Sequence, residues 1–233
     1  MSRITRKELK KDTFALEIGH TVSFFEEHQR EIIRYGGIAL AVIIVAGGFW
    51  IYKERRHSAR EQALARAIQI QESPVGPPTP GQNANFPTQD LKDQAAIKAF
   101  SDVQAQYGNN SEGVIAQYYL GSINADQGKL AEAEKLYKDV AARGDANYSS
   151  LAKLSLAQVY FADGRADQGE ALLRDLMAHP SLFVSSDQAA ILLARMLAPK
   201  KPAEARKLLE PLRGKAGAAS QTALNVLSEL PPQ

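Results

Sequence analysis

Residues 117–140 read QYYLGSINADQGKLAEAEKLYKDV, and residues 153–176 read KLSLAQVYFADGRADQGEALLRDL. The two stretches align without a gap at an offset of 36 residues. Self-similarity at a period of about 20–50 residues is typical of repeat proteins, in which each unit packs on its neighbours. The matched positions are Leu120-Gly121 with Leu156-Ala157, Gly128 with Gly164, Ala133 with Gly169, Tyr137 with Leu173, and Val140 with Leu176.

The matched residues predict that each unit is a helical hairpin. The small residue after the leucine lets two antiparallel helices approach closely, and the glycine ends the first helix in a left-handed cap. The small residue early in the second helix lies where helices cross, and the large residue four positions later fills the gap between units. The period resembles the roughly 34 residues of a tetratricopeptide unit.

The pattern extends on both sides of these two units. In a third unit the turn reads APKKP at 198–202, and Leu193-Ala194, Ala205 and Leu209 take the matched positions. Before the first full unit, Ala96 and Phe100 place the second helix of an earlier unit at 91–107, and its first helix is then 53–72. Residues 221–230 are predicted to form a capping helix, because a terminal repeat needs a polar outer face. We therefore predict an all-α solenoid of about three and a half hairpin units over 89–233.

An apolar segment precedes the repeats. Residues 36–52 read GGIALAVIIVAGGFWIY, seventeen residues without a charge. A helix of this length covers roughly 25 Å, at the short end of what spans a bilayer core. Its last residues include Trp50 and Tyr52, and such amphipathic rings favour the headgroup level. A cleaved signal peptide is disfavoured because about 35 residues precede the run and it ends in bulky aromatics. A buried core helix would show polar positions every three or four residues, and this stretch shows none, so an uncleaved anchor is favoured. We predict one transmembrane helix at 36–52.

Two other segments flank this helix. Residues 1–35 are predicted to be an N-terminal segment with an amphipathic helix, whose apolar face carries Phe14, Ile18, Val22 and Phe25. Residues 53–72 are predicted to continue as a membrane-proximal helix, and the Pro- and Gly-rich run at 73–88 is predicted to be a loop. Charge leaves the orientation open, because five basic residues lie at 53–66 and only two in the twenty residues before Gly36, while five more lie at 3–11.

Several function classes are excluded by composition and motif. The chain has no cysteine, which rules out thiolate catalysis and Cys-ligated zinc, and its four histidines show no metal-ligand spacing. With 28 basic and 26 acidic residues the net charge is only +2, which is too small an excess to indicate nucleic-acid binding. The S-x-x-K match at Ser150 and Lys153 lacks the companion motifs of serine acylases, and Arg143-Gly144-Asp145 is a turn sequence. We expect no enzyme activity, no cofactor, no metal and no small-molecule substrate.

Protein binding is the function that a repeat architecture favours. The first helix of each unit lines the concave face, and the residues there are apolar or aromatic with few charges. They suit a hydrophobic or extended peptide, although several of them also fit an interhelical core. The predicted groove residues are Ile115, Tyr118, Ser122, Leu151, Leu154, Gln158, Phe161, Ile191 and Arg195.

The order of these parts resembles a known family over essentially the whole chain. A basic tail, one span, a helix, a loop and degenerate tetratricopeptide units are similar to the ancillary SecYEG translocon subunit family. The repeat residues that carry this resemblance are Leu120, Gly121, Gly128, Ala133, Tyr137, Leu156, Ala157 and Gly164. The resemblance implies a single-pass protein of the cell inner membrane, with a cytoplasmic N-terminus and a periplasmic repeat domain. It also implies that the partners are translocon subunits, exported proteins and periplasmic chaperones.

Two other functions are compatible with the same residues. One is a scaffold for another cell-envelope assembly, such as cell division or outer-membrane biogenesis. The other is a cytosol-facing repeat adaptor, which the basic cluster at 53–66 favours.

Overall fold

The computed structural model describes residues 29–77 and 86–231. Within these ranges the regular structure is helical, apart from one isolated bridge between Val75 and Phe86. The apolar face of the amphipathic helix that the sequence predicts before the apolar run falls within residues 1–28, which are outside the described residues. The chain divides at residue 58 into two units, which are described separately.

Helix α2 runs without a break over Gln29–Glu72. Its most apolar window of 18 residues has a mean hydropathy of 1.8, and none of that window is buried. The segments that the sequence predicts at 36–52 and 53–72 are both parts of this one helix. Polarity changes after Tyr52, but Lys, Glu and Arg are good helix formers, so nothing ends the helix there. It stops where the proline run begins, and the Ser73 hydroxyl donates a hydrogen bond of 2.7 Å to the Gln69 carbonyl.

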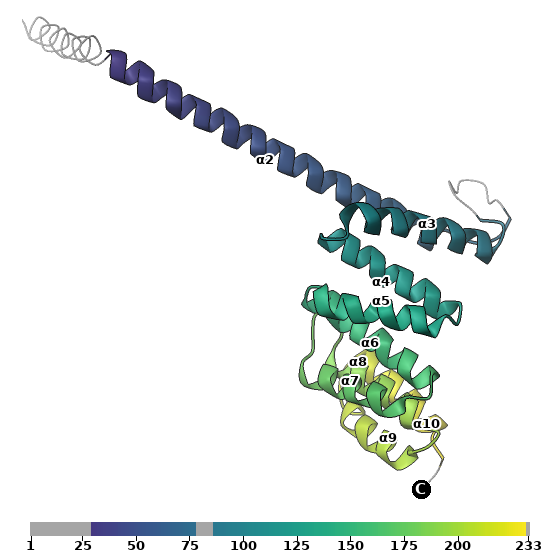
Figure 1. The fold of residues 1–233 in the computed structure, drawn as a ribbon. Helices are drawn as coiled ribbons and strands as arrows, with labels where there is room; N and C mark the ends of the chain where they lie inside the picture. Colours follow the sequence, from purple (N-terminus) through teal and green to yellow (C-terminus); the bar gives the residue numbers. More distant parts are fainter. Residues whose placement is uncertain (1–28, 78–85, 232–233) are drawn as a thin grey trace, which may run out of the picture. The chain divides into compact units, whose positions relative to one another are not determined.

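The second unit is a stack of helices joined mostly by short turns (Figure 1). Three hairpins, α4–α5, α6–α7 and α8–α9, follow one another, with α3 before them and α10 after them. The predicted all-α architecture, a long apolar helix followed by stacked tetratricopeptide-like hairpins, is confirmed. The helices are α3 (Gln89–Tyr107), α4 (Ser111–Asp126), α5 (Leu130–Arg143), α6 (Ala146–Ala162), α7 (Ala166–Ala178), α8 (Ser186–Leu197), α9 (Pro202–Leu209) and α10 (Ala218–Glu229), with a 3-10 turn at Glu210–Leu212.

Two glycines end the first helices of successive hairpins in the left-handed conformation. Gly128 has φ of +74° and Gly164 has φ of +77°. After α4, the amides of Gly128 and Lys129 donate to the carbonyls of Ala125 and Asn124, both at 2.9 Å. The same pair of bonds recurs after α6, from Gly164 and Arg165 to Phe161 and Tyr160, at 3.2 and 2.7 Å. These paired bonds are the Schellman motif, which satisfies helix-terminal carbonyls and turns the chain into the next helix.

Small residues sit where the helices of a hairpin approach each other. A Cβ atom added to Gly121 would lie 2.8 Å from the Tyr137 ring, and one added to Gly169 would lie 2.7 Å from the Phe161 ring. The predicted filler residues are buried, with Phe100, Leu173 and Leu209 at 0% exposure. Their burial joins neighbouring hairpins into a core of three clusters, one of which also includes Leu64 and Ala67 of α2.

Polar contacts repeat with the same period of 36 residues. Within one hairpin the Gln117 amide donates to Asp139 at 2.8 Å, and in the next Lys153 pairs with Asp175 at 2.8 Å. Between hairpins, Arg165 pairs with Glu134 at 2.5 Å, and Lys201 pairs with Glu170 at 3.3 Å. Each of these glutamates also pairs with a cation four residues later, Lys138 at 2.6 Å and Arg174 at 2.7 Å respectively.

Candidate peptide-binding groove

The predicted groove residues lie on the first helices of the three hairpins. They recur at steps of three and four residues, which puts each set on one face of its helix. The sets are Ile115, Tyr118 and Ser122 on α4, Leu151, Leu154, Gln158 and Phe161 on α6, and Ile191 and Arg195 on α8.

Their burial divides these residues into three kinds. Gln158 and Arg195 are the more accessible ones, and Ile191, with 9% exposure, belongs to the core. The other six are half-buried. Leu151, Leu154 and Phe161 pack against the C-terminal core cluster with one side. The half-buried set therefore keeps accessible apolar surface while contributing to the packing between helices.

A cavity of about 370 Å³ lies between α6, α8 and α10. Four of the predicted residues line it, namely Leu154, Gln158, Ile191 and Arg195. The remaining lining comes from α8 and its N-cap, with Ser185, Gln188 and Leu192, and from the N-terminal part of α10, with Ala218, Ala219 and Thr222. Sequence reasoning missed the contribution of α10, because the repeat pattern does not say on which neighbour a terminal helix packs.

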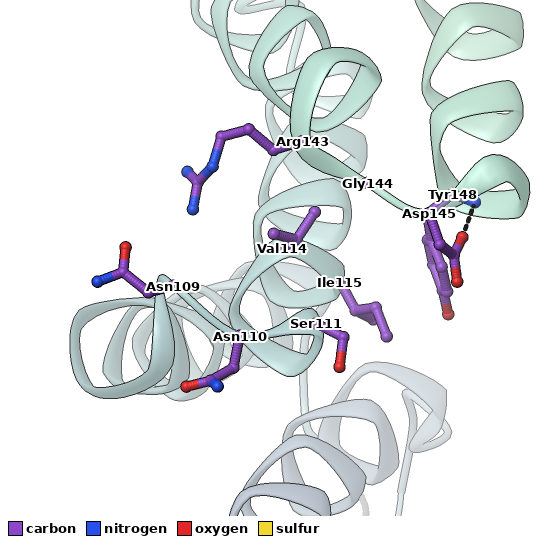
Figure 2. A pocket seen from close by; sticks show the side chains of 9 residues that line it. All are labelled: Asn109, Asn110, Ser111, Val114, Ile115, Arg143, Gly144, Asp145 and Tyr148. Carbon is purple, nitrogen blue, oxygen red and sulfur yellow. Dashed lines mark hydrogen bonds between the residues drawn. The ribbon is translucent and has the colours of Figure 1, made fainter.

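A smaller cavity of about 200 Å³ lies where the α3–α4 turn meets the α5–α6 turn (Figure 2). Ile115 is the one predicted groove residue that lines it. Arg143 donates to Asp139 at 2.8 Å and to the Gly108 carbonyl. Asp145 caps α6 by accepting hydrogen bonds of 3.0 and 2.8 Å from the amides of Asn147 and Tyr148. Both charged side chains of the Arg-Gly-Asp sequence therefore have hydrogen-bond partners within the repeat domain.

Tyr118 is the centre of an aromatic chain that the sequence did not reveal. Its ring lies 5.7 to 5.9 Å from the rings of Tyr119, Tyr137 and Tyr148. The chain continues from Tyr119 to Phe100 at 4.8 Å and from Tyr148 to Phe183 at 5.6 Å. Such pairs are worth about 0.5–1.5 kcal/mol beyond the burial of their area. The one signal in the sequence is that Tyr148 and Phe183 stand 35 residues apart, close to one repeat.

Burial governs the ionisation of these phenols. It raises the pKa of Tyr137 to about 12 and also raises the pKa of Tyr119 and of Tyr148. All three are therefore neutral at physiological pH and keep a hydroxyl proton to donate. Tyr118 and Ser155, on neighbouring hairpins, share a hydrogen bond of 3.4 Å between their hydroxyls.

The residues of the S-x-x-K match have separate structural partners. The Ser150 hydroxyl donates to the Ala146 carbonyl at 2.6 Å, and Lys153 pairs with Asp175. His179 Nδ1 lies 3.0 Å from the other oxygen of Asp175. Over residues 29–77 and 86–231, no group of three or more His, Cys, Asp or Glu side chains has the arrangement of a metal site.

Comparisons with known proteins agree on the fold. Residues 23–189 match the family described as the tetratricopeptide repeat-like domain. Two crystal structures of a Podosopora anserina protein, described as a putative kinesin light chain with nearly identical TPR-like repeats, superpose with a TM-score of 0.54 at 18% identity. One of the two is a single-residue variant, and the matches cover 74% of this chain and 84–85% of theirs. No curated protein matches the sequence.

Proposed function

We propose that this chain, which belongs to the tetratricopeptide repeat-like domain family, is a membrane-anchored module that binds extended segments of other proteins. Repeat domains of this type are typically non-catalytic and serve protein–protein interaction. The observation that carries the proposal is the face shared by α4, α6 and α8. On it, half-buried apolar side chains such as Tyr118, Leu154 and Phe161 remain accessible beside a cavity of about 370 Å³.

The first part of α2 supports the anchor. Large apolar side chains such as Ile38, Val42 and Phe49 are more than half exposed on it. A helix that is apolar on all sides is stable only inside a large protein or a bilayer. At the end of the apolar run Arg56 lies over the Tyr52 ring, 5.1 Å from its centroid. An aromatic and cationic pair of this kind suits the headgroup level.

The groove is tested by site-specific photocrosslinking in intact membranes. A crosslinking side chain at Tyr118 or Phe161 is expected to capture polypeptides that the same probe at Leu91 does not capture. Leu91 is the matched control, because it is apolar and 47% exposed but lies on α3. Serine at both groove positions is expected to abolish capture from a probe at Leu154 while the helical circular dichroism is retained. Equal capture from all positions would contradict the proposal.

Within this role, we propose an ancillary translocon subunit that holds exported proteins or recruits periplasmic chaperones. The order of tail, span, helix, loop and repeats motivates it. Affinity purification after membrane crosslinking is expected to recover translocon subunits. Their absence, with a different set of envelope proteins recovered, would instead favour a scaffold for another assembly.

We propose that the repeats face the periplasm and that the N-terminus is cytoplasmic. The basic cluster at 53–66 favours the opposite orientation, with a cytosol-facing adaptor. Protease added to spheroplasts decides between them. Cleavage beyond residue 72 from outside supports the periplasmic orientation, and protection of this region would contradict it.

A further inference from the structure

Arg195 differs from the other arginines of the repeat region. Its side chain makes no ion pair or hydrogen bond within residues 86–231, where the side chain of every other arginine makes at least one. Arg143, Arg165, Arg174 and Arg213 pair with carboxylates, and Arg206 donates to the Pro231 carbonyl. Because an arginine fork has five donors in a fixed plane, a free one beside a groove is ready for a planar acceptor.

The surroundings of Arg195 select the chemistry of that acceptor. It lines the cavity between α6, α8 and α10, together with the apolar side chains of Leu154, Ile191 and Leu192. Over the described residues, no carboxylate lines this cavity, and Arg195 is its one charged group. The Gln158 and Gln188 side chains also line it, and their amides are suited to hydrogen bonds with a peptide main chain.

A second cavity also borders Arg195. Its volume is about 780 Å³, and Arg195 lines it together with Pro199, Val226 and Leu230. Glu229 also lines this second cavity but makes no ion pair with Arg195. Because Arg195 borders both cavities, a bound chain has room on either side of it. The site therefore fits a segment that passes through better than one that ends there.

Resting on the proposed function, we propose that this groove selects extended segments that carry an aspartate or glutamate among apolar residues. The apolar side chains contact Leu154, Ile191 and Leu192, and the internal carboxylate pairs with Arg195. Such a pair adds specificity more than affinity, since charge complementarity mainly discriminates between partners.

The test uses the full-length chain in detergent micelles and short fluorescent peptides with blocked ends. Their sequences contain leucine, valine, serine and glycine and differ at one central position, which is Asp, Asn or Lys. The Asp peptide is expected to bind about three- to fivefold more tightly than the Asn peptide, because a partly exposed ion pair contributes up to about 1 kcal/mol. The Lys peptide is expected to bind most weakly.

Arg195→Gln is expected to make the Asp and Asn peptides bind equally, and Arg195→Lys to keep part of the preference. The matched control is Arg213→Gln, which removes an exposed arginine that pairs with Glu210 and does not line the groove. This control is expected to keep the full preference. Circular dichroism of each variant verifies the fold.

Three results would overturn the inference, and they differ in what they say of the proposed function. Equal binding of the Asp and Asn peptides by the unmodified chain would refute the charge selection and leave an apolar groove standing. Binding of no peptide would overturn both. A further Asn peptide with a free C-terminal carboxylate tests the alternative occupant. If binding of this peptide alone depends on Arg195, the site binds a chain end, and the proposed pairing of Arg195 with an internal carboxylate is wrong.

Discussion

At the scale of single residues, the turns between helices depend on left-handed glycines. A Cβ at Gly128 meets no neighbour within 4 Å, so its φ of +74° is the constraint that remains. We predict that Gly128→Ala lowers the free energy of unfolding by about 1–2 kcal/mol, the cost of a left-handed backbone for a residue with a Cβ. Urea unfolding measures the change. Gly214→Ala is the control, because Gly214 also has open space but a φ outside the left-handed region; an equal loss there would contradict the account.

Gly121 and Tyr137 illustrate a different use of glycine. The Tyr137 ring occupies the space that a Cβ at Gly121 would need, at 2.8 Å. The corresponding pair of the next hairpin is Ala157 and Leu173. There the small residue has a methyl group, and the large residue opposite has no ring. We predict that Gly121→Ala destabilises the chain by about 1–3 kcal/mol through overpacking. Adding Tyr137→Leu is expected to recover most of this loss, and a double-mutant cycle of unfolding free energies measures the coupling. Additive effects of the two changes would show that the contact does not matter.

At the scale of elements, ion pairs join one hairpin to the next. The hydrogen bonds of Glu134 with Arg165 and then Lys138 lower the pKa of Glu134 from 4.5 to about 2. A group with a lowered pKa in the folded state stabilises it above the unfolded pKa, and this contribution is lost as pH falls. We predict that Glu134→Gln destabilises the chain at pH 6 and that the difference shrinks between about pH 4.5 and pH 2. Unfolding midpoints across this range measure it.

The control for this pH dependence is Glu132→Gln. Glu132 is exposed on the same helix and makes no ion pair within the described residues. Its replacement is expected to leave the midpoint nearly unchanged at both ends of the range. A pH dependence equal to that of Glu134→Gln would assign the effect to the net charge of α5 rather than to the contact with Arg165.

The helices and turns could be predicted because their signals are local. Leu120-Gly121 and Gly128 carry their roles in their own residue types, so the period of 36 residues is enough to predict the hairpins. The change from apolar to charged residues after Tyr52 marks a boundary of polarity, and the helix continues through it. The aromatic chain from Phe100 to Phe183 joins residues that are distant in sequence. No local pattern states which rings will meet, and the same holds for the placement of α10 beside α8.

At the scale of the whole molecule, stability is expected to be a sum over units and their interfaces. Removal of residues 117–152, one period of 36, places Lys153 where Gln117 stands. We predict that this shortened chain folds, with unchanged helicity per residue and a lower unfolding midpoint. Removal of 117–148 is the control, because it shifts the register by four residues. Equal solubility and helicity of the two products would contradict the periodic account.

The repetition of the polar contacts has a consequence for the history of the gene. Glu134 with Arg165 and Glu170 with Lys201 are the same junction made twice, at the same spacing. A duplicated stretch of 36 codons encodes one such glutamate, which can pair with the hairpin that follows. It also encodes one such cation, which can pair with the hairpin that precedes. Recombination can therefore lengthen or shorten the binding surface in whole steps, and natural variants of this protein should differ by complete units rather than by fractions of one.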